Sequence, residues 1–208
     1  MKRWRAMSAL VKGLLLGVSI AAPVGPIGIL CIRTTLAQGR TYGFAAGLGA
    51  ATADAVYGTV AAIGLTSVSR FLLGQASVIQ AAGALFLLFL AYRTLRSPVA
   101  ELQSLERSGK DALRIFASTF ALTMTNPMTI LSFLGIFAGL NLGPLGGADA
   151  AALVGGVFLG SALWWLCLSL TVGMFRRMIG QRVMTGINWC AGCILLAFGL
   201  YSLYHVLV

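Results

Sequence analysis

A charge-free stretch runs from Gly13 to Ile32, and the motif Pro23-Val24-Gly25-Pro26 lies in its middle. The stretch is long enough to cross a bilayer, because a spanning helix needs roughly 20 apolar residues. The motif is expected to break that helix partway across, since proline removes a backbone donor and clashes with the carbonyl four residues earlier. Backbone groups freed inside hydrocarbon are tolerated only where they meet protein or line a wet cavity. The motif therefore predicts a binding site at membrane depth.

The composition is that of a membrane protein. Of the 208 residues, 59% are hydrophobic and 10% are charged, whereas a soluble domain carries about 25% charged residues. Hydrophobic residues are spread along the whole chain, so we expect one integral membrane domain, residues 1–208. The net charge of +10 comes from Lys and Arg residues between the apolar segments. Membrane topology accounts for that distribution, which argues against nucleic-acid binding.

Charged residues divide the chain into six apolar windows, which predict six transmembrane helices in an all-α membrane protein. The windows are Gly13–Ile32, Thr41–Ser69, Phe71–Tyr92, Ile115–Ala148, Ala150–Phe175 and Val183–Tyr204. Lys and Arg concentrate in the first, third and fifth loops, which the positive-inside rule places in the cytoplasm. Both termini then lie outside the cell. The N-terminal tail opposes this orientation, because it carries four basic residues of its own: Lys2, Arg3, Arg5 and Lys12.

A second helix break, Asn126-Pro127, lies in the second half of the chain at the place that corresponds to the first break. The halves, 13–95 and 115–207, contain three windows each, and the cytoplasmic loop 96–114 joins them. Three spans per half invert the second half relative to the first. Matched breaks of this kind are typical of transporters built from inverted repeats.

Small-residue spacing also recurs between the halves. Gly43 and Gly47 lie in the second window, and Gly156 and Gly160 lie in the fifth. Such spacing lets helices approach closely, either within the bundle or in a homodimer. Coincidence is the alternative explanation, because Gly is frequent in membrane helices.

Asp54 is the only charged residue between Arg40 and Arg70, near the middle of the second window. A carboxylate at mid-bilayer costs about 2.5–3.5 kcal/mol on insertion scales, so its presence indicates a function. Asp54 shares a helical stripe with four small residues, which directs it into the bundle: Gly43, Gly47, Ala50 and Gly58. There it would carry a proton or pair with a substrate ammonium group. A structural hydrogen bond is the alternative role.

The two breaks would supply the rest of a site for a zwitterion. Half-helices that start after a break present free N–H groups and a positive dipole end. These groups would hold the α-carboxylate of an amino acid while Asp54 faces its α-ammonium group. The alternative is that the prolines only kink the helices for packing. The residues concerned are Pro23, Gly25, Pro26, Asn126 and Pro127.

These motifs resemble those of the lysine exporter (LysE/RhtB) family of bacterial amino-acid exporters. The matching residues are Pro23-Val24-Gly25-Pro26, Gln38-Gly39-x3-Gly43, Gly47, Gly49, Asp54 and Asn126-Pro127. The resemblance implies a six-helix inner-membrane carrier that exports amino acids and is driven by the proton gradient. The family usually reads Asn-Pro-Lys at the second break, whereas Met128 follows Pro127 here. Any role of that lysine therefore does not carry over.

Other features favour other functions. Cys190-Ala191-Gly192-Cys193 is the spacing of a redox pair, so a membrane thiol–disulfide conduit is one alternative. A permease for cations or other metabolites on the same scaffold is another. Trp164 and Trp165 suit packing or lipid contact, with gating as the alternative. The sequence contains no metal-ligand cluster, Walker motif or nucleophile–base pair, so we expect no metal, no cofactor and no enzymatic activity.

Overall fold

The structure is a computed structural model that describes residues 2–22, 25–62, 76–96, 109–126, 129–130, 132–133, 147–176 and 181–207. Within these ranges the chain forms seven α-helices and no β-strand. The helices are α1 (Lys2–Ala21), α2 (Pro26–Gln38), α3 (Arg40–Ala62), α5 (Ala76–Arg96), α7 (Gly109–Thr125), α9 (Gly147–Phe175) and α10 (Gln181–Leu207). The predicted all-α class is therefore confirmed.

Two of the described helices are long and apolar enough to cross a membrane: α9 and the segment Thr185–Tyr204 of α10. Ala6–Ala21 and Pro26–Gln38 meet the same criteria as a pair, and they are bent by 81° relative to each other. The described part of the chain thus offers two spans, or three if the bent pair counts as one. Six spans in two inverted repeats stay a prediction.

The ends of α2 follow from its sequence. Pro26 occupies the first helical position, where its missing N–H group costs nothing and its fixed φ suits a helix. Gly39 ends the helix at φ 110°, a backbone conformation that favours glycine, and its N–H group donates to the Thr35 carbonyl at 2.9 Å. Because α3 begins at the next residue, α2 and α3 are joined by a single-residue turn.

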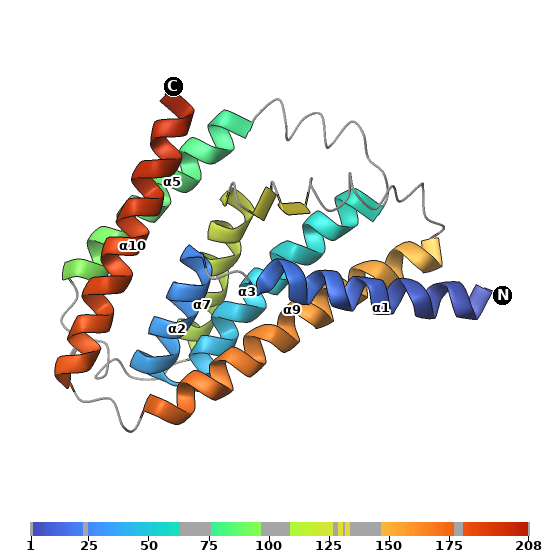
Figure 1. The fold of residues 1–208 in the computed structure, drawn as a ribbon, viewed down its shortest axis with the longest axis horizontal. Helices are drawn as coiled ribbons and strands as arrows, with labels where there is room; N and C mark the ends of the chain where they lie inside the picture. The colour runs from blue at the N-terminus through green and yellow to red at the C-terminus, as the bar shows by residue number, and fades with distance from the viewer. Residues whose placement is uncertain are drawn as a thin grey trace.

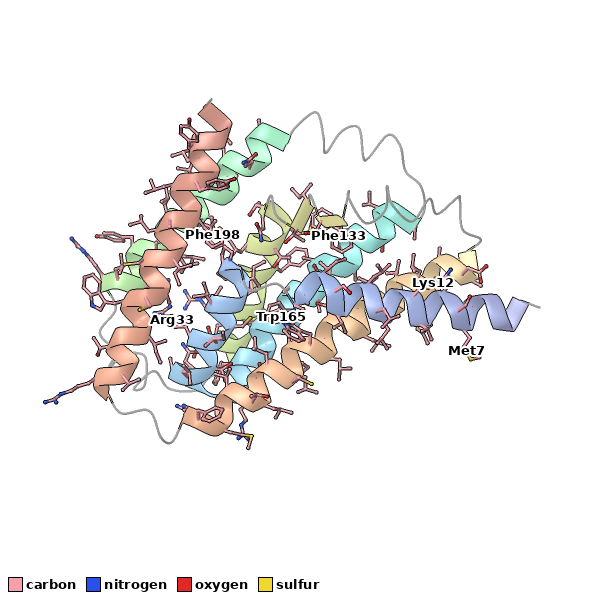
Figure 2. The ribbon with its side chains drawn as sticks, in the orientation of Figure 1. Met7, Lys12, Arg33, Phe133, Trp165 and Phe198 are labelled. Carbon is pink, nitrogen blue, oxygen red and sulfur yellow. The ribbon has the colours of Figure 1, made fainter. Side chains whose placement is uncertain are left out.

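The helices pack in two connected groups (Figure 1). One group contains α1, α3, α7 and α9, with α1 along α9 and α3 against both α9 and α7. The other group is the pair α5 and α10, and α2 lies between the two groups, in contact with α3, α9 and α10. The side chains of Met7 and Lys12 on α1 are exposed, whereas Trp165 lies among the helices (Figure 2). The position of α2 places the start of that helix at the centre of the bundle.

Glycines let α9 approach two neighbours, but in different ways. A Cβ atom at Gly160 would lie 2.1 Å from the carbonyl oxygen of Leu14, so α1 and α9 meet backbone to backbone. A Cβ atom at Gly47 would lie 2.2 Å from the Cβ atom of Trp165, so α3 receives a side chain of α9. Gly43 likewise faces the Thr35 side chain. A Cβ atom at Gly58 would make only ordinary contacts, the nearest of them 3.7 Å away.

Two arginines, Arg33 of α2 and Arg176, anchor the C-terminal half of α2, and we refer to them as the arginine clamp. Arg176 donates from Nε to the Leu36 carbonyl at 2.9 Å and from Nη2 to the Ala37 carbonyl at 3.0 Å. Arg33 donates from Nε to the Oδ1 atom of Asn188 on α10. Arg176 thereby satisfies carbonyls in the last turn of α2, where a cation is also favoured by the helix dipole. The clamp fixes one end of α2 while its other end remains at the centre of the bundle.

Candidate functional site

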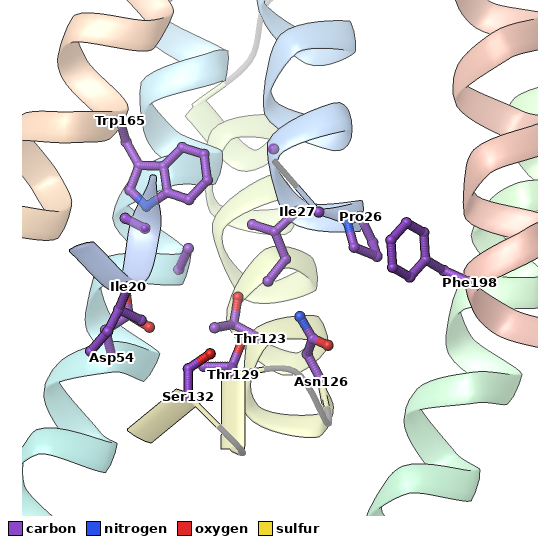
Figure 3. A pocket seen from close by; sticks show the side chains of 14 residues that line it. Ile20, Pro26, Ile27, Asp54, Thr123, Asn126, Thr129, Ser132, Trp165 and Phe198 are labelled. Carbon is purple, nitrogen blue, oxygen red and sulfur yellow. The ribbon is translucent and has the colours of Figure 1, made fainter. Parts of the chain in front are cut away.

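A cavity of about 140 Å³ lies where α1 ends and α2 begins. Its walls come from α1, α2, α3, α7, α9 and α10 and from Asn126, Thr129 and Ser132. Figure 3 shows the side chains around it. The lining residues are Ile20, Ala21, Gly25, Pro26, Ile27, Gly28, Ala50, Asp54, Thr123, Asn126, Thr129, Ser132, Trp165 and Phe198.

The cavity brings together four of the six residues predicted for substrate binding and coupling. Gly25 and Pro26 form the start of α2, Asp54 comes from α3, and Asn126 follows the end of α7. Pro23 and Pro127 lie outside the described residues, as does Met128. The predicted packing residues Gly43, Gly47 and Gly58 do not line the cavity. They lie along α3 on either side of Asp54 and face α2 or α9.

Asp54 is buried, with 3% of its surface exposed. The hydroxyl group of Ser161 donates a hydrogen bond to its Oδ2 atom at 2.7 Å. The indole Nε1 of Trp165 donates in turn to the Oγ atom of Ser161 at 3.2 Å. Among the described lining residues, Asp54 is the only one with an ionisable acid or base. The cavity therefore contains one carboxylate, supported by a chain of two hydrogen bonds from α9.

The end of α7 forms the polar wall of the cavity. Thr123 and Asn126 reach the cavity from this end, and Thr129 and Ser132 follow them (Figure 3). The Thr123 hydroxyl donates to the Thr119 carbonyl at 2.8 Å, so it takes up a backbone acceptor inside the helix. The polar wall thus presents one amide and three hydroxyl groups.

Tyr57 of α3 stabilises the position where α7 ends. Its hydroxyl group donates to the Met124 carbonyl at 2.5 Å, and its ring packs against Phe133 with 5.3 Å between the ring centroids. Carbonyls in the last turn of a helix lack helical partners, so a side-chain donor there offsets the cost of ending α7 inside the bundle. Asp54 lies one turn from Tyr57 on α3 and faces the cavity. Tyr57 therefore fixes the position of the Asp54 carboxylate relative to the end of α7.

The opposite wall is apolar. Ile20 and Ile27 lie on either side of the gap between α1 and α2, and Phe198 points from α10 toward Pro26 (Figure 3). A cavity with one carboxylate, a polar wall and an apolar wall suits a small solute that carries both charge and an apolar part.

Sequence reasoning missed Ser161 and Phe198 and assigned Trp165 to packing or lipid contact. Ser161 and Trp165 are four residues apart, so they share one face of α9. That spacing was visible in the sequence, but it does not tell which helix the face meets. The contact of Trp165 with Gly47 and the bond of Ser161 to Asp54 depend on the packing of α3 against α9.

The cysteines lie apart from the cavity. Cys190 and Cys193 are free and exposed on α10, Cys167 is exposed on α9, and Cys31 is buried in α2. None of the four lines the cavity. In the described ranges, no three His, Cys, Asp or Glu side chains gather in a way that could hold a metal ion.

Comparisons with known proteins identify the family of this chain. The model of the LysE type translocator family matches residues 18–206. The chain is 29% identical over 205 residues to "Putative amino acid efflux protein YcgF" of Bacillus subtilis (strain 168), which covers 96% of this chain and 97% of the relative. It is also 29% identical over 181 residues to "Uncharacterized membrane protein YahN" of Escherichia coli (strain K12), which covers 84% of this chain and 79% of the relative. No solved structure matches. Because the family model spans nearly the whole chain, this protein belongs to the LysE type translocator family.

Proposed function

We propose that this protein is a six-span secondary transporter of the bacterial inner membrane that exports amino acids, or a closely related small zwitterion, in exchange for protons. Membership of the LysE type translocator family supports transport. The name of the Bacillus subtilis relative specifies amino acid efflux for that protein. The observation that carries the proposal is the cavity in which Asp54, the start of α2 and Asn126 meet.

The cavity offers a complementary group to each end of a zwitterion. The substrate ammonium group binds beside the Asp54 carboxylate. The substrate carboxylate binds at the start of α2, where the first N–H groups of a helix point out of its end, and near the Asn126 amide. The volume of about 140 Å³ is close to the roughly 150 Å³ of an engineered cavity that binds benzene. A small or medium-sized amino acid is therefore the expected substrate.

Competition for Asp54 couples the proton to the substrate. A protonated carboxyl group no longer pairs with an ammonium group, so proton binding releases the substrate and substrate binding displaces the proton. The carrier changes the side to which it opens only when Asp54 is neutralised, either by a proton or by the substrate ammonium group. Such a carrier exchanges protons for substrate across the membrane. A single buried carboxylate in the cavity is the minimum that this exchange needs.

Orientation follows from the basic helix ends. One end of the bundle contains the ends of several helices (Figure 1). They are the C-terminal ends of α2, α5 and α9 and the N-terminal ends of α3, α7 and α10. This end carries Arg33, Arg40, Arg93, Arg96, Arg114, Arg176 and Arg182. The positive-inside rule places such an end in the cytoplasm, so both termini lie on the opposite side.

The test uses purified protein in proteoliposomes with an imposed pH gradient and a panel of radiolabelled amino acids. We expect gradient-driven flux of one class of amino acid with the wild type and none with Asp54→Asn. Asp149→Asn is the matched control, because Asp149 lies in the first turn of α9 and not in the cavity. It should transport like the wild type.

Two results would contradict the proposal. Normal gradient-driven flux by Asp54→Asn would remove Asp54 from the coupling mechanism. Absence of flux for every amino acid, with intact reconstituted wild-type protein, would exclude amino acids as substrates. It would then favour an inorganic cation, another metabolite or thiol chemistry at Cys190 and Cys193, each of which the same vesicles can test.

A further inference from the structure

We infer that Ser161 and Trp165 are positioning residues: their hydrogen-bond chain fixes the Asp54 carboxylate so that Oδ1, and not Oδ2, meets the substrate ammonium group and the coupling proton. The inference rests on the role proposed for Asp54 and adds two residues of α9 to the site.

The direction of the chain follows from the chemistry of its members. An indole Nε1–H group can only donate, so the Ser161 Oγ atom must be the acceptor in its bond with Trp165. Serine has a single O–H donor, and at 2.7 Å from the carboxylate it is directed at Oδ2 of Asp54. Oδ2 is therefore an acceptor held by α9. The other oxygen, Oδ1, has no hydrogen-bond partner among the described residues.

The packing of α3 against α9 keeps this chain in place. The two helices run antiparallel, because Gly47 faces Trp165 while Gly58, eleven positions later, faces Val157. Asp54 meets Ser161 between these two contacts. The Trp165 side chain fits against α3 only because position 47 is glycine, which leaves the indole in the cavity wall with its N–H group toward Ser161. Trp165 therefore serves both as a wall and as the first donor of the chain.

The site is asymmetric in its donors. On the α9 side, Asp54 Oδ2 accepts a hydrogen bond from a neutral hydroxyl, which needs no charge and no water. A substrate that approaches from the cavity meets a carboxylate whose plane is already set. Preorganisation of this kind lowers the entropy lost when the ammonium group binds. Loss of the chain should therefore weaken substrate binding more than the turnover of the loaded carrier.

The transport test compares Ser161→Ala with Ser161→Thr, which keeps the hydroxyl group. A hydrogen bond to a charged group is worth enough that we expect Ser161→Ala to raise KM about tenfold, with Vmax per folded carrier changed far less. Ser161→Thr should restore KM to within about threefold of the wild type. Trp165→Phe keeps a ring in the wall and removes the N–H group, so its KM should lie between those of the wild type and Ser161→Ala.

Two matched controls separate positioning from packing. Ser169 lies two turns after Ser161 on α9, is buried, and has no hydrogen-bond partner among the described residues. Trp164 neighbours Trp165 but does not line the cavity. Ser169→Ala and Trp164→Phe should leave KM unchanged. A KM in Ser161→Ala equal to that of Ser169→Ala would overturn the inference.

A second measurement does not depend on transport. Dicyclohexylcarbodiimide, an apolar reagent for carboxyl groups in membranes, is added to the purified protein, and its attachment at Asp54 is followed by mass spectrometry. Ser161→Ala should label about twice as fast as the wild type, because both carboxylate oxygens become available in place of one. Ser161→Thr and Ser169→Ala should label at the wild-type rate.

The transport assay and the labelling of Asp54 test the proposed substrate and the positioning role separately. If the wild type moves no amino acid but the labelling pattern is as expected, the proposed substrate is wrong and the positioning of Asp54 stands. If amino acids are transported but Ser161→Ala labels like the wild type with an unchanged KM, the positioning role is wrong and the proposed function stands.

Discussion

α9 has two glycine-lined interfaces, with α1 and with α3, and they differ in what packs against the glycines. Against α1, Gly156 and Gly160 face carbonyl oxygens of Leu10 and Leu14, so two backbones are in direct contact. Against α3, Gly47 faces the side chain of Trp165, which lines the cavity. Neither close atom can move without its helix, because a carbonyl oxygen is part of the backbone and rotation about χ1 leaves the Cβ atom of Trp165 in place. The interface with α1 joins two backbones, whereas the interface with α3 also positions a functional side chain.

The largest effect is expected from Gly156→Ala. The new Cβ atom would lie 2.3 Å from the Leu10 carbonyl oxygen, a contact that forces α1 and α9 apart. We expect a loss of about 1–3 kcal/mol in the free energy of unfolding, as for other overpacked sites. Thermal unfolding of the purified protein in detergent measures this as a lower midpoint.

The adjacent glycine is the control for that substitution. A Cβ atom at Gly155 would have no heavy atom within 4 Å, so Gly155→Ala should keep or raise the midpoint through its better helix propensity, by up to about 1 kcal/mol. Equal midpoints for the two variants would show that α1 and α9 are not in backbone contact.

An effect on transport as well as on stability is expected from Gly47→Ala. The added methyl group would push α3 and α9 apart and displace Trp165, because their Cβ atoms would lie 2.2 Å apart. We expect KM to rise several-fold, to roughly the level of Trp165→Phe, since both changes remove the donor to Ser161. The KM of the double variant, Gly47→Ala with Trp165→Phe, should be no higher than that of either single variant. Additive effects in this cycle would mean that Gly47 acts independently of Trp165.

The smallest effect is expected from Gly58→Ala. Its Cβ atom would lie 3.7 Å from a methyl carbon of Val157, an ordinary van der Waals contact. Both KM and the unfolding midpoint should stay close to the wild-type values, with at most a small gain in stability from helix propensity. A large rise in KM or a large fall in the unfolding midpoint would indicate that α3 and α9 lie closer together at this turn than they do in the structure.

The sequence predicted the parts of the site whose signals are local and energetically large. An aspartate inside an apolar window and a proline-glycine break can each be recognised without knowing any neighbour. Asp54, Gly25, Pro26 and Asn126 were found in this way, and they line one cavity. The all-α class followed from the apolar windows for the same reason.

Residues whose role depends on a partner helix could not be found from the sequence. Serine and tryptophan occur at many positions in apolar helices, and only the rotation of α9 about its axis brings Ser161 and Trp165 to Asp54. That rotation is set by contacts with α1 and α3, which are distant in the sequence. The matched spacing of Gly43 and Gly47 with Gly156 and Gly160 was visible, but their different neighbours were not.

The arginine clamp on α2 also constrains how the protein is made. The carbonyl of Leu36 has no hydrogen bond from Arg176 until that residue, 140 positions later in the chain, has been synthesised. Arg33 likewise has no bond to Asn188 until the chain is 155 residues longer. At a synthesis rate of about 5–20 residues per second, the first of these delays lasts roughly 7–28 s. During that time α2 lies in the translocation machinery or the membrane without its final partners. The last turn of α2 therefore gains its donors from Arg176, and Arg33 gains its bond to α10, only after the second half of the chain has been inserted beside the first.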